Sequence, residues 1–158
     1  MTAPIKLPAH SPHCMGCGPE NCSGLQLVAY RDDDQVYANH SFTEKQVGGP
    51  GLAHGGAISA ACDDIMGFTL HLAGTPAVTR TLTVRYRRPV PLHVPVRLTA
   101  WIVESADHLL HIEATGTIEQ QVFFSAVGEF AKVDLAHFQR YADSSIVDSF
   151  FVNFLRPD

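Results

Sequence analysis

The stretch HGGAISAACDDIMGFTLHLA, residues 54–73, decides how this chain can fold. After its glycine pair almost every position is apolar, so no polar stripe separates a buried face from a solvent-facing one. A helix that is apolar nearly all round has to be buried within the protein. A Gly-Thr-Pro triplet at 74–76 predicts its end. The sequence therefore predicts one buried helix from His54 to about Ala73.

Alternating apolar and polar residues on both sides of this helix predict β-strands. Two alternating segments precede the helix as a hairpin, and about four follow it. The predicted strands cover residues 24–32, 35–43, 78–89, 96–105, 109–118 and 122–133. Because a long antiparallel sheet must cover its apolar face, one helix wrapped by the sheet is the economical solution. The predicted fold class is α+β, with an antiparallel sheet of about five to six strands around one central buried helix.

The 158 residues fit a single domain, expected at 25–133. Residues 1–24 are rich in Pro, Gly, Cys, Ser and Asn, which predicts an irregular N-terminal arm. Residues 134–158 form a C-terminal extension that we expect to pack on the domain or on a neighbouring chain. Its apolar side chains include Phe150, Phe151, Val152, Phe154 and Leu155.

Composition and charge argue against several classes of protein. Hydrophobic residues make up 46% and charged residues 17%, which predicts a packed core. The net charge of −5 argues against a nucleic-acid partner, since phosphate binding needs a basic face. No segment has the character of a signal peptide or of a membrane-spanning helix. We expect a cytoplasmic protein with no membrane partner and with reduced cysteines.

Two adjacent carboxylates, Asp63 and Asp64, are the only charges of the predicted helix. A buried carboxylate is costly unless it is paired or hydrogen-bonded. Neighbouring positions point about 100° apart on a helix, so at most one can face a given cleft. Their place, two turns after a glycine-rich start, is typical of a catalytic site. The alternative is that one caps a backbone amide and the other reaches solvent.

The helix start, His54-Gly55-Gly56, is the second candidate element. The first N–H groups of a helix lack internal partners and carry partial positive charge. Glycine allows a substrate to approach the backbone closely. These N–H groups can therefore donate to a carbonyl oxygen that becomes an oxyanion. An ordinary glycine turn beside a surface histidine is the alternative.

The segments HGGAISAACDDIMG (54–67) and VTRTLTVRYRRPVPL (78–92) resemble the hotdog-fold acyl-CoA thioesterases of the PaaI-like group. That group has His-Gly-Gly, an acidic residue eight positions after the first glycine, and a strand with an early Thr or Ser. Asp63 and Thr79 match these positions. CMGCGPENCSGLQL (14–27) resembles the N-terminal Cys-x-x-Cys-Gly motif of one subgroup.

The resemblance implies hydrolysis of an acyl-CoA thioester to free acid and CoA. Asp63 would be the general base that activates water, or a nucleophile that forms an acyl anhydride. The Gly55 N–H would polarise the thioester carbonyl, and Gly56 would shape the turn at the substrate. Thr79 would come from the partner subunit and orient the water. His54 would either hydrogen-bond near the carbonyl or hold the loop.

Family sites are usually built between two subunits, so the resemblance also implies a homodimer or homotetramer, without a cofactor. Many relatives have Asn six residues before the histidine, where this chain has Gly48. One polar contact to substrate or water is therefore missing, although the loop at 48–56 matches a subgroup that also lacks this asparagine. The departure bears on rate and specificity more than on reaction class.

Four arginines lie on and just after the strand that follows the helix. Alternation puts Arg85 and Arg87 on one face, with Arg80 and Arg88 on the other. Because arginine binds phosphate well, Arg85, Arg87 and Arg88 are candidate contacts for CoA, and Asp64 is a further substrate-binding candidate. A solvated strand edge is the alternative.

The pair Cys14-x-x-Cys17, with His13 and Cys22 nearby, presents four potential zinc ligands within a short segment. Zinc sites more often have two separated ligand pairs, and the subgroup motif carries its cysteines without an implied metal. We therefore predict no metal and a structural or incidental role for these residues. Zinc binding and redox sensing are the alternatives.

Two other functions are compatible with a hotdog domain. One is a module that binds acyl-CoA without hydrolysing it; the carboxylate expected beside the thioester favours the enzyme. The other is a dehydratase, whose Asp-x-x-x-x-His signature is absent, since Phe68 and Thr69 stand five positions after the two aspartates. The acyl group is not identified by the sequence.

Overall fold

The centre of the molecule is a helix of 14 residues, α1 (Gly55–Phe68), followed by the short α2 (Leu70–Ala73). The computed structural model describes residues 3–154. His54 caps α1, because its Nδ1 accepts a hydrogen bond of 2.8 Å from the Gly56 N–H. Gly74 ends α2 in the left-handed conformation, with φ +63°, where glycine has no steric penalty. The predicted buried helix is confirmed.

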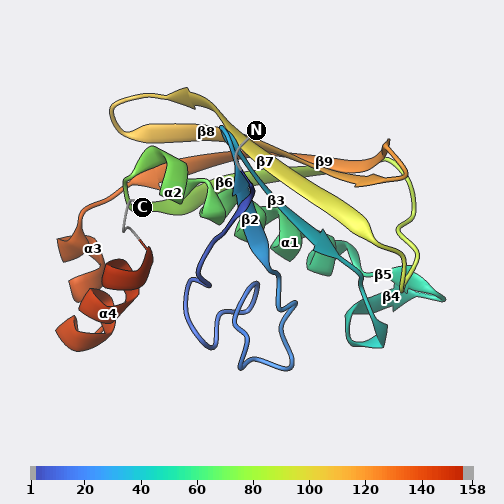
Figure 1. Cartoon of the computed structure of the whole chain (residues 1–158), viewed down its shortest axis with the longest axis horizontal. Coiled ribbons are helices and arrows are strands. Elements are labelled where there is room, and N and C mark those ends of the chain that lie inside the picture. The colour runs from blue at the N-terminus through green and yellow to red at the C-terminus, as the bar shows by residue number, and fades with distance from the viewer. Residues whose placement is uncertain (1–2, 155–158) are drawn as a thin grey trace.

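A seven-stranded antiparallel sheet curves over α1 (Figure 1). Its strand order is β1-β2-β3-β7-β8-β9-β6, so β1 and β6 are the edges. The strands are β1 (Ile5–Lys6), β2 (Ala29–Asp32), β3 (Gln35–His40), β6 (Ala77–Tyr86), β7 (Val96–Ser105), β8 (Leu109–Ile118) and β9 (Gln121–Lys132). The α+β prediction is confirmed, with one strand more than expected. The addition is β1, which is too short to show a periodicity.

The first predicted strand is shorter than expected. Residues 24–28 are irregular, and Gln26 has a left-handed φ of 53°. The glycine-dense loop before α1 also holds structure that was not predicted. The 3₁₀ turn η1 (Glu44–Gln46) leads into a small hairpin of β4 (Val47–Gly49) and β5 (Leu52–Ala53). This hairpin ends at His54 and so fixes where α1 begins.

Small side chains let α1 approach the sheet. Ala100, Ala114 and Ala126 face one another on β7, β8 and β9, and all three are buried. Their short side chains leave room for the helix, as close packing requires. Larger side chains fill the space around this row: Phe42, Ile65, Met66, Phe68, Leu98, Leu110, Ile112 and Phe124.

Two helices follow the sheet, α3 (Leu135–Gln139) and α4 (Ser144–Phe154), and they lie together beside one end of the domain (Figure 1). Phe150 packs against the core, and the rings of Phe138 and Phe151 lie 5.1 Å apart. Leu155 and the side chain of Phe154 are outside the described part. Within that part, the helices are too short or too polar to cross a membrane.

Candidate active site

Asp63 lies on a partly exposed face of α1 and is paired with a hydroxyl group. Thr79 Oγ1 donates a hydrogen bond of 2.7 Å to Asp63 Oδ1. Thr79 belongs to the same chain, so the expectation that it reaches Asp63 from a partner subunit is wrong for this contact. The reason is the turn at Gly74, after which β6 returns alongside α1 and brings Thr79 next to the carboxylate.

The exposed face of α1 consists of small residues. Gly56, Asp63 and Gly67, with the adjacent pair Ser59 and Ala60 between them, lie three or four positions from their neighbours along the helix, so they form one stripe. None of them is buried, whereas Ile58, Ala61, Cys62, Ile65, Met66 and Phe68 are. Ser59, Asp63 and Gly67 lie against Tyr86, Thr79 and His10 of the same chain, but the stripe remains the most exposed face of the helix.

A cavity of about 390 Å³ opens beside Asp63 and Thr79. Its polar groups come from α1, from β6 and from the N-terminal arm, and its walls include apolar side chains from the sheet and from the C-terminal helices. The apolar and aromatic walls are Leu70, Val78, Phe130, Phe138, Phe150 and Phe151. A carboxylate with a bound hydroxyl therefore faces a space that can hold an apolar group.

A second cavity, of about 280 Å³, lies at the start of α1. Gly55, Tyr86, Arg87 and Arg88 are among its lining residues. The Tyr86 hydroxyl donates to the Gly55 carbonyl at 2.9 Å and lies 2.6 Å from Ser59 Oγ. Tyr86 thus ties the end of β6 to the first turn of the helix.

The helix start has one N–H group available for a ligand. His54 Nδ1 takes the Gly56 N–H, which is a loop-holding role for this histidine. The Gly55 N–H is the first of the helix and has no partner within the helix itself. A Cβ at Gly55 would lie 3.5 Å from the Tyr86 ring, which is an ordinary contact. Glycine is therefore not required there by the fold of the single chain.

The two halves of the expected site are apart within one chain. Gly55 and Asp63 are separated by two turns of α1, which corresponds to about 12 Å along the helix axis. They line different cavities, Asp63 with Thr79 and Gly55 with Arg87 and Arg88. A single thioester cannot contact both groups of the same chain.

The arginines only partly follow the predicted alternation. β6 ends at Tyr86, and the N–H groups of Arg87 and Arg88 both donate to the Phe123 carbonyl, at 2.8 and 3.0 Å. This irregularity places both residues at the Gly55 cavity instead of on opposite faces. Arg85 is exposed and lines neither of the two cavities.

Asp64 is buried and has partners in the N-terminal arm. Its Oδ1 lies 3.1 Å from His10 Nδ1 and 3.4 Å from Cys14 Sγ. Burial raises the pKa of the Asp64 carboxyl. Burial also lowers the pKa of His10, but the hydrogen bonds to Asp64 and Cys14 outweigh it and raise that pKa to about 9. Asp64 thus belongs to a polar cluster beneath the arm.

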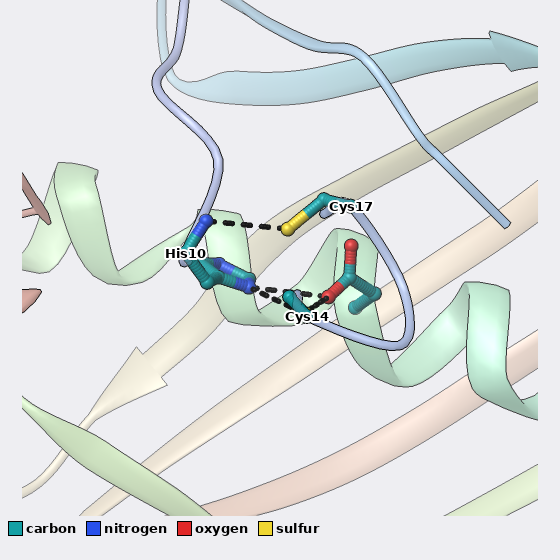
Figure 2. A group of neighbouring side chains, drawn as sticks. His10, Cys14 and Cys17 are labelled. Carbon is teal, nitrogen blue, oxygen red and sulfur yellow. Dashed lines mark hydrogen bonds and ion pairs between the residues drawn. The ribbon is translucent and has the colours of Figure 1, made fainter. Parts of the chain in front are cut away.

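Sequence reasoning missed this cluster. Figure 2 shows His10, Cys14 and Cys17 turned toward one another. His13 and Cys22, the ligands considered with the two cysteines, point elsewhere: His13 lies 3.6 Å from Glu20, and Cys22 is exposed. The donor set His10, Cys14, Cys17 and Asp64 is the one that could hold a metal among the described residues. The short spacing between His10 and Cys14 is visible in the sequence, but their contact with Asp64 depends on the fold.

Comparison with known proteins agrees with this architecture. Residues 50–123 match the family model of the thioesterase superfamily. The acyl-coenzyme A thioesterase THEM4 of Bos taurus is 26% identical over 124 residues, covering 74% of this chain and 50% of the relative. THEM5 of Homo sapiens, also an acyl-coenzyme A thioesterase, is 29% identical over 90 residues, covering 56% and 36%. The chain thus spans half or less of the length of these relatives.

Solved structures share the fold. A crystal structure of a thioesterase superfamily protein superposes with a TM-score of 0.70 at 30% identity, over 75% of this chain and 60% of that one. A putative thioesterase of Ralstonia eutropha, a phenylacetic acid degradation-related protein, gives 0.61 at 18% identity, over 68% and 85%. A hypothetical thioesterase of Streptococcus pneumoniae with coenzyme A gives 0.61 at 19%, over 64% and 82%. Residues 50–123 are thus similar to the thioesterase superfamily, and the seven-stranded sheet around α1 has the arrangement of a hotdog fold.

Proposed function

We propose that this chain hydrolyses acyl-CoA thioesters, with Asp63 as the group that drives the attack on the carbonyl. The observation that carries the proposal is the Asp63–Thr79 pair at the mouth of an apolar cavity. A carboxylate next to an apolar space is costly unless the site uses it. The superfamily and its acyl-CoA thioesterase relatives make thioester hydrolysis the reaction that fits this pair.

The hydrogen bond from Thr79 occupies one oxygen of the carboxylate. Oδ1 of Asp63 accepts it, which leaves Oδ2 to take a proton from water or to attack the carbonyl itself. In the first case water adds to the thioester, the oxyanion forms, and CoA leaves as a thiol with the proton that Asp63 has taken. In the second case the carboxylate displaces the CoA thiolate to form an acyl anhydride, and water then cleaves the anhydride to the free acid and the restored Asp63 carboxylate. Thr79 holds the carboxylate in position in both.

The oxyanion donor has to come from a second copy of the chain. Gly55 is too far from Asp63 along α1, so two helices must lie antiparallel, with Gly55 of one chain opposite Asp63 of the other. The open stripe of small residues on α1 lets two helices approach closely. The edge strand β6 adjoins this stripe and has an unpaired edge in the single chain, so the same dimer can extend the sheet. Each dimer then contains two sites.

This arrangement assigns the two cavities to the two parts of the substrate. The Phe138, Phe150 and Phe151 wall would hold the acyl group beside Asp63. Arg87 and Arg88, next to Gly55 of the other chain, would contact the phosphates of CoA. Solved relatives bound to coenzyme A and to acetyl CoA support this ligand class.

Two further solved structures bear on the catalytic pair. They are variants of the Streptococcus pneumoniae thioesterase, in which an aspartate and a threonine sixteen residues apart have each been replaced by alanine. Asp63 and Thr79 have the same separation of sixteen residues and are hydrogen-bonded. This agreement in spacing supports the choice of these two residues.

A mixed-dimer experiment tests the proposal. Asp63→Asn removes the carboxylate, and Gly55→Val adds a branched side chain next to the Gly55 N–H, at a position where a Cβ would meet the Tyr86 ring at 3.5 Å. Each variant alone should be nearly inactive. Co-expressed with different tags and purified as the heterodimer, the two should recover about half of the wild-type rate per dimer, because one of two sites has both native groups.

The result separates the alternatives. A heterodimer no more active than either parent would mean that each site is built within one chain, which contradicts the shared arrangement. A wild type that binds acyl-CoA tightly but hydrolyses no member of a panel of chain lengths would instead support a binding module. Sedimentation of all variants confirms that their oligomeric state is unchanged.

A further inference from the structure

Four side chains with metal-binding atoms meet beneath the N-terminal arm. His10, Cys14 and Cys17 come from the arm, and Asp64 comes from α1. Their ligand atoms all lie within 4.8 Å of one another. The closest are His10 Nδ1 and Asp64 Oδ1 at 3.1 Å; Cys14 Sγ lies 3.4 Å from that oxygen and 3.9 Å from that nitrogen. Figure 2 shows these arm residues side by side, with the His10 backbone next to Cys17 and the His10 ring next to Cys14.

These separations approach those of a tetrahedral metal site, so small side-chain movements would complete one. Zinc binds sulfur at about 2.3 Å and nitrogen or oxygen at about 2.0–2.2 Å, so ligand atoms of one tetrahedral ion lie roughly 3.3–3.8 Å apart. The separations of 3.1, 3.4 and 3.9 Å among His10, Cys14 and Asp64 are close to this range. If hydrogen bonds alone held these groups together, each pair would need a donor between its two atoms. Here one carboxylate oxygen, one nitrogen and two sulfurs share a single small volume, which a cation among them would explain.

The backbone of the arm reaches one of the two candidate sulfur ligands. The N–H of His10 donates to Cys17 Sγ at 3.2 Å. Such a bond stabilises a thiolate, which is the form that binds metal. Both cysteines are free of disulfides, and Cys17 is buried.

The N-terminal arm passes in close contact with α1 at this cluster. A Cβ at Gly16 would lie 2.1 Å from Cγ of Asp64, so only glycine lets the arm pass over the carboxylate. Oδ2 of Asp64 is buried and has no hydrogen-bond partner among the described residues. A buried carboxylate is costly unless its charge is paired, and a cation bound at Oδ1 would pair that charge.

The geometry points to a structural zinc site formed by His10 Nδ1, Cys14 Sγ, Cys17 Sγ and Asp64 Oδ1, which fastens the N-terminal arm to α1. Two thiolates, an imidazole and a carboxylate form a donor set suited to Zn²⁺. Four protein ligands fill its tetrahedral sphere, which is the pattern of a structural ion and leaves no position for substrate. The expectation of no metal is revised by this inference.

The site goes beyond the proposed hydrolysis and does not depend on it. Asp64 follows Asp63 directly, and His10 and Cys14 line the same cavity as Asp63. The ion would therefore hold one wall of that cavity in place. Because binding needs both thiols deprotonated, zinc uptake releases protons, and zinc removal loosens the arm.

Metal analysis of the full chain tests the inference. The chain purified with zinc and a reductant should contain about one zinc per chain, as expected for one closed four-ligand site. Replacement by Co²⁺ should give an intense thiolate-to-cobalt absorption band and the strong visible bands of tetrahedral cobalt. Cys17→Ser and Asp64→Asn should each lower the zinc content about tenfold or more, because one of four ligands is lost.

Matched controls are available in the same arm. Cys22→Ser and His13→Gln alter an exposed cysteine and an exposed histidine outside the cluster, and should keep full zinc content. Should a ligand variant fail to fold, the cobalt spectrum of the wild type still decides the question. A wild type that takes up no zinc or cobalt, or that holds a Cys14–Cys17 disulfide under reducing conditions, overturns the site. Equal loss of zinc in the control variants overturns this ligand set. None of these readouts uses thioester hydrolysis.

Discussion

Asp63 and Asp64 are consecutive residues of α1, but their carboxylates have different partners. Oδ1 of Asp63 accepts a hydrogen bond from Thr79 of β6 at 2.7 Å, whereas Oδ1 of Asp64 lies 3.1 Å from His10 of the arm. The turn of about 100° per residue along a helix is what separates them. The Asp63 carboxylate is thus paired with β6, and the Asp64 carboxylate contacts the arm.

Thr79→Val should lower kcat about tenfold and leave KM nearly unchanged, because one hydrogen bond to a charged group contributes about 1.5–3 kcal/mol and part of that is regained from water. Thr79→Ser keeps a hydroxyl and should retain most of the rate. Steady-state kinetics on one acyl-CoA check both variants. A Val variant with wild-type kcat would show that the hydroxyl does not position Asp63.

Gly16→Ala should destabilise the chain by about 2 kcal/mol or more, since overpacking costs typically 1–3 kcal/mol and the new Cβ would overlap the Asp64 carboxyl. Gly49→Ala is the matched control, because its Cβ would meet nothing closer than Leu52 at 3.9 Å. Urea unfolding of both variants measures the difference. Equal stability of the two would contradict the close passage of the arm over Asp64.

Phe138→Ala should raise KM for medium-chain and aryl acyl-CoA several-fold, with a smaller effect on acetyl-CoA. The reason is that Phe138 forms part of the aromatic wall of the Asp63 cavity, and a buried aromatic contact contributes about 1.5–3 kcal/mol. A panel of chain lengths checks this. A uniform change across all chain lengths would mean that the wall does not contact the acyl group.

His71 should make the folded state less stable in mild acid. Burial, together with the positive charges of His10 and Arg31, lowers the pKa of His71 from 6.5 to about 4. Between these values the unfolded chain binds the proton and the native chain does not, so the free energy of unfolding falls as the pH falls through this window.

The change His71→Gln should therefore reduce the loss of stability between pH 7 and about 5, because it removes the group that is protonated only on unfolding. His108→Gln is the control, since His108 is exposed in the turn before β8. Urea unfolding at several pH values gives the comparison. Parallel pH curves for the wild type and His71→Gln would contradict this role.

Much of the fold followed from periodicity. The strands after the helix alternate over ten or more residues, and α1 lacks a polar stripe, so local pattern and tertiary position agree. The two residues of β1 and the bend at Gln26 carry no such pattern. Their conformation depends on contacts with the rest of the domain, and the hydrophobic periodicity of the sequence does not show such contacts.

The sequence predicted which residues belong to the candidate site but not how they are arranged in space. Asp63 and Thr79 meet because the turn at Gly74 reverses the chain, a relation between elements that motif spacing does not contain. The separation of Gly55 from Asp63 follows from helix geometry, so it could have been calculated from the sequence. The contact of His10 with Asp64 joins positions far apart in the chain, so only the fold could show it.

The most direct test of the central claim is the rate of CoA release by wild type and Asp63→Asn, measured with a thiol-reactive dye over a panel of acyl-CoAs. Asn keeps the shape of the side chain but can act neither as a base nor as a nucleophile. With Asp107→Asn, an exposed turn residue, as control, we predict that Asp63→Asn lowers kcat about a hundredfold or more while fold and oligomeric state are preserved. An Asp63→Asn variant that turns over at the wild-type rate would contradict the account.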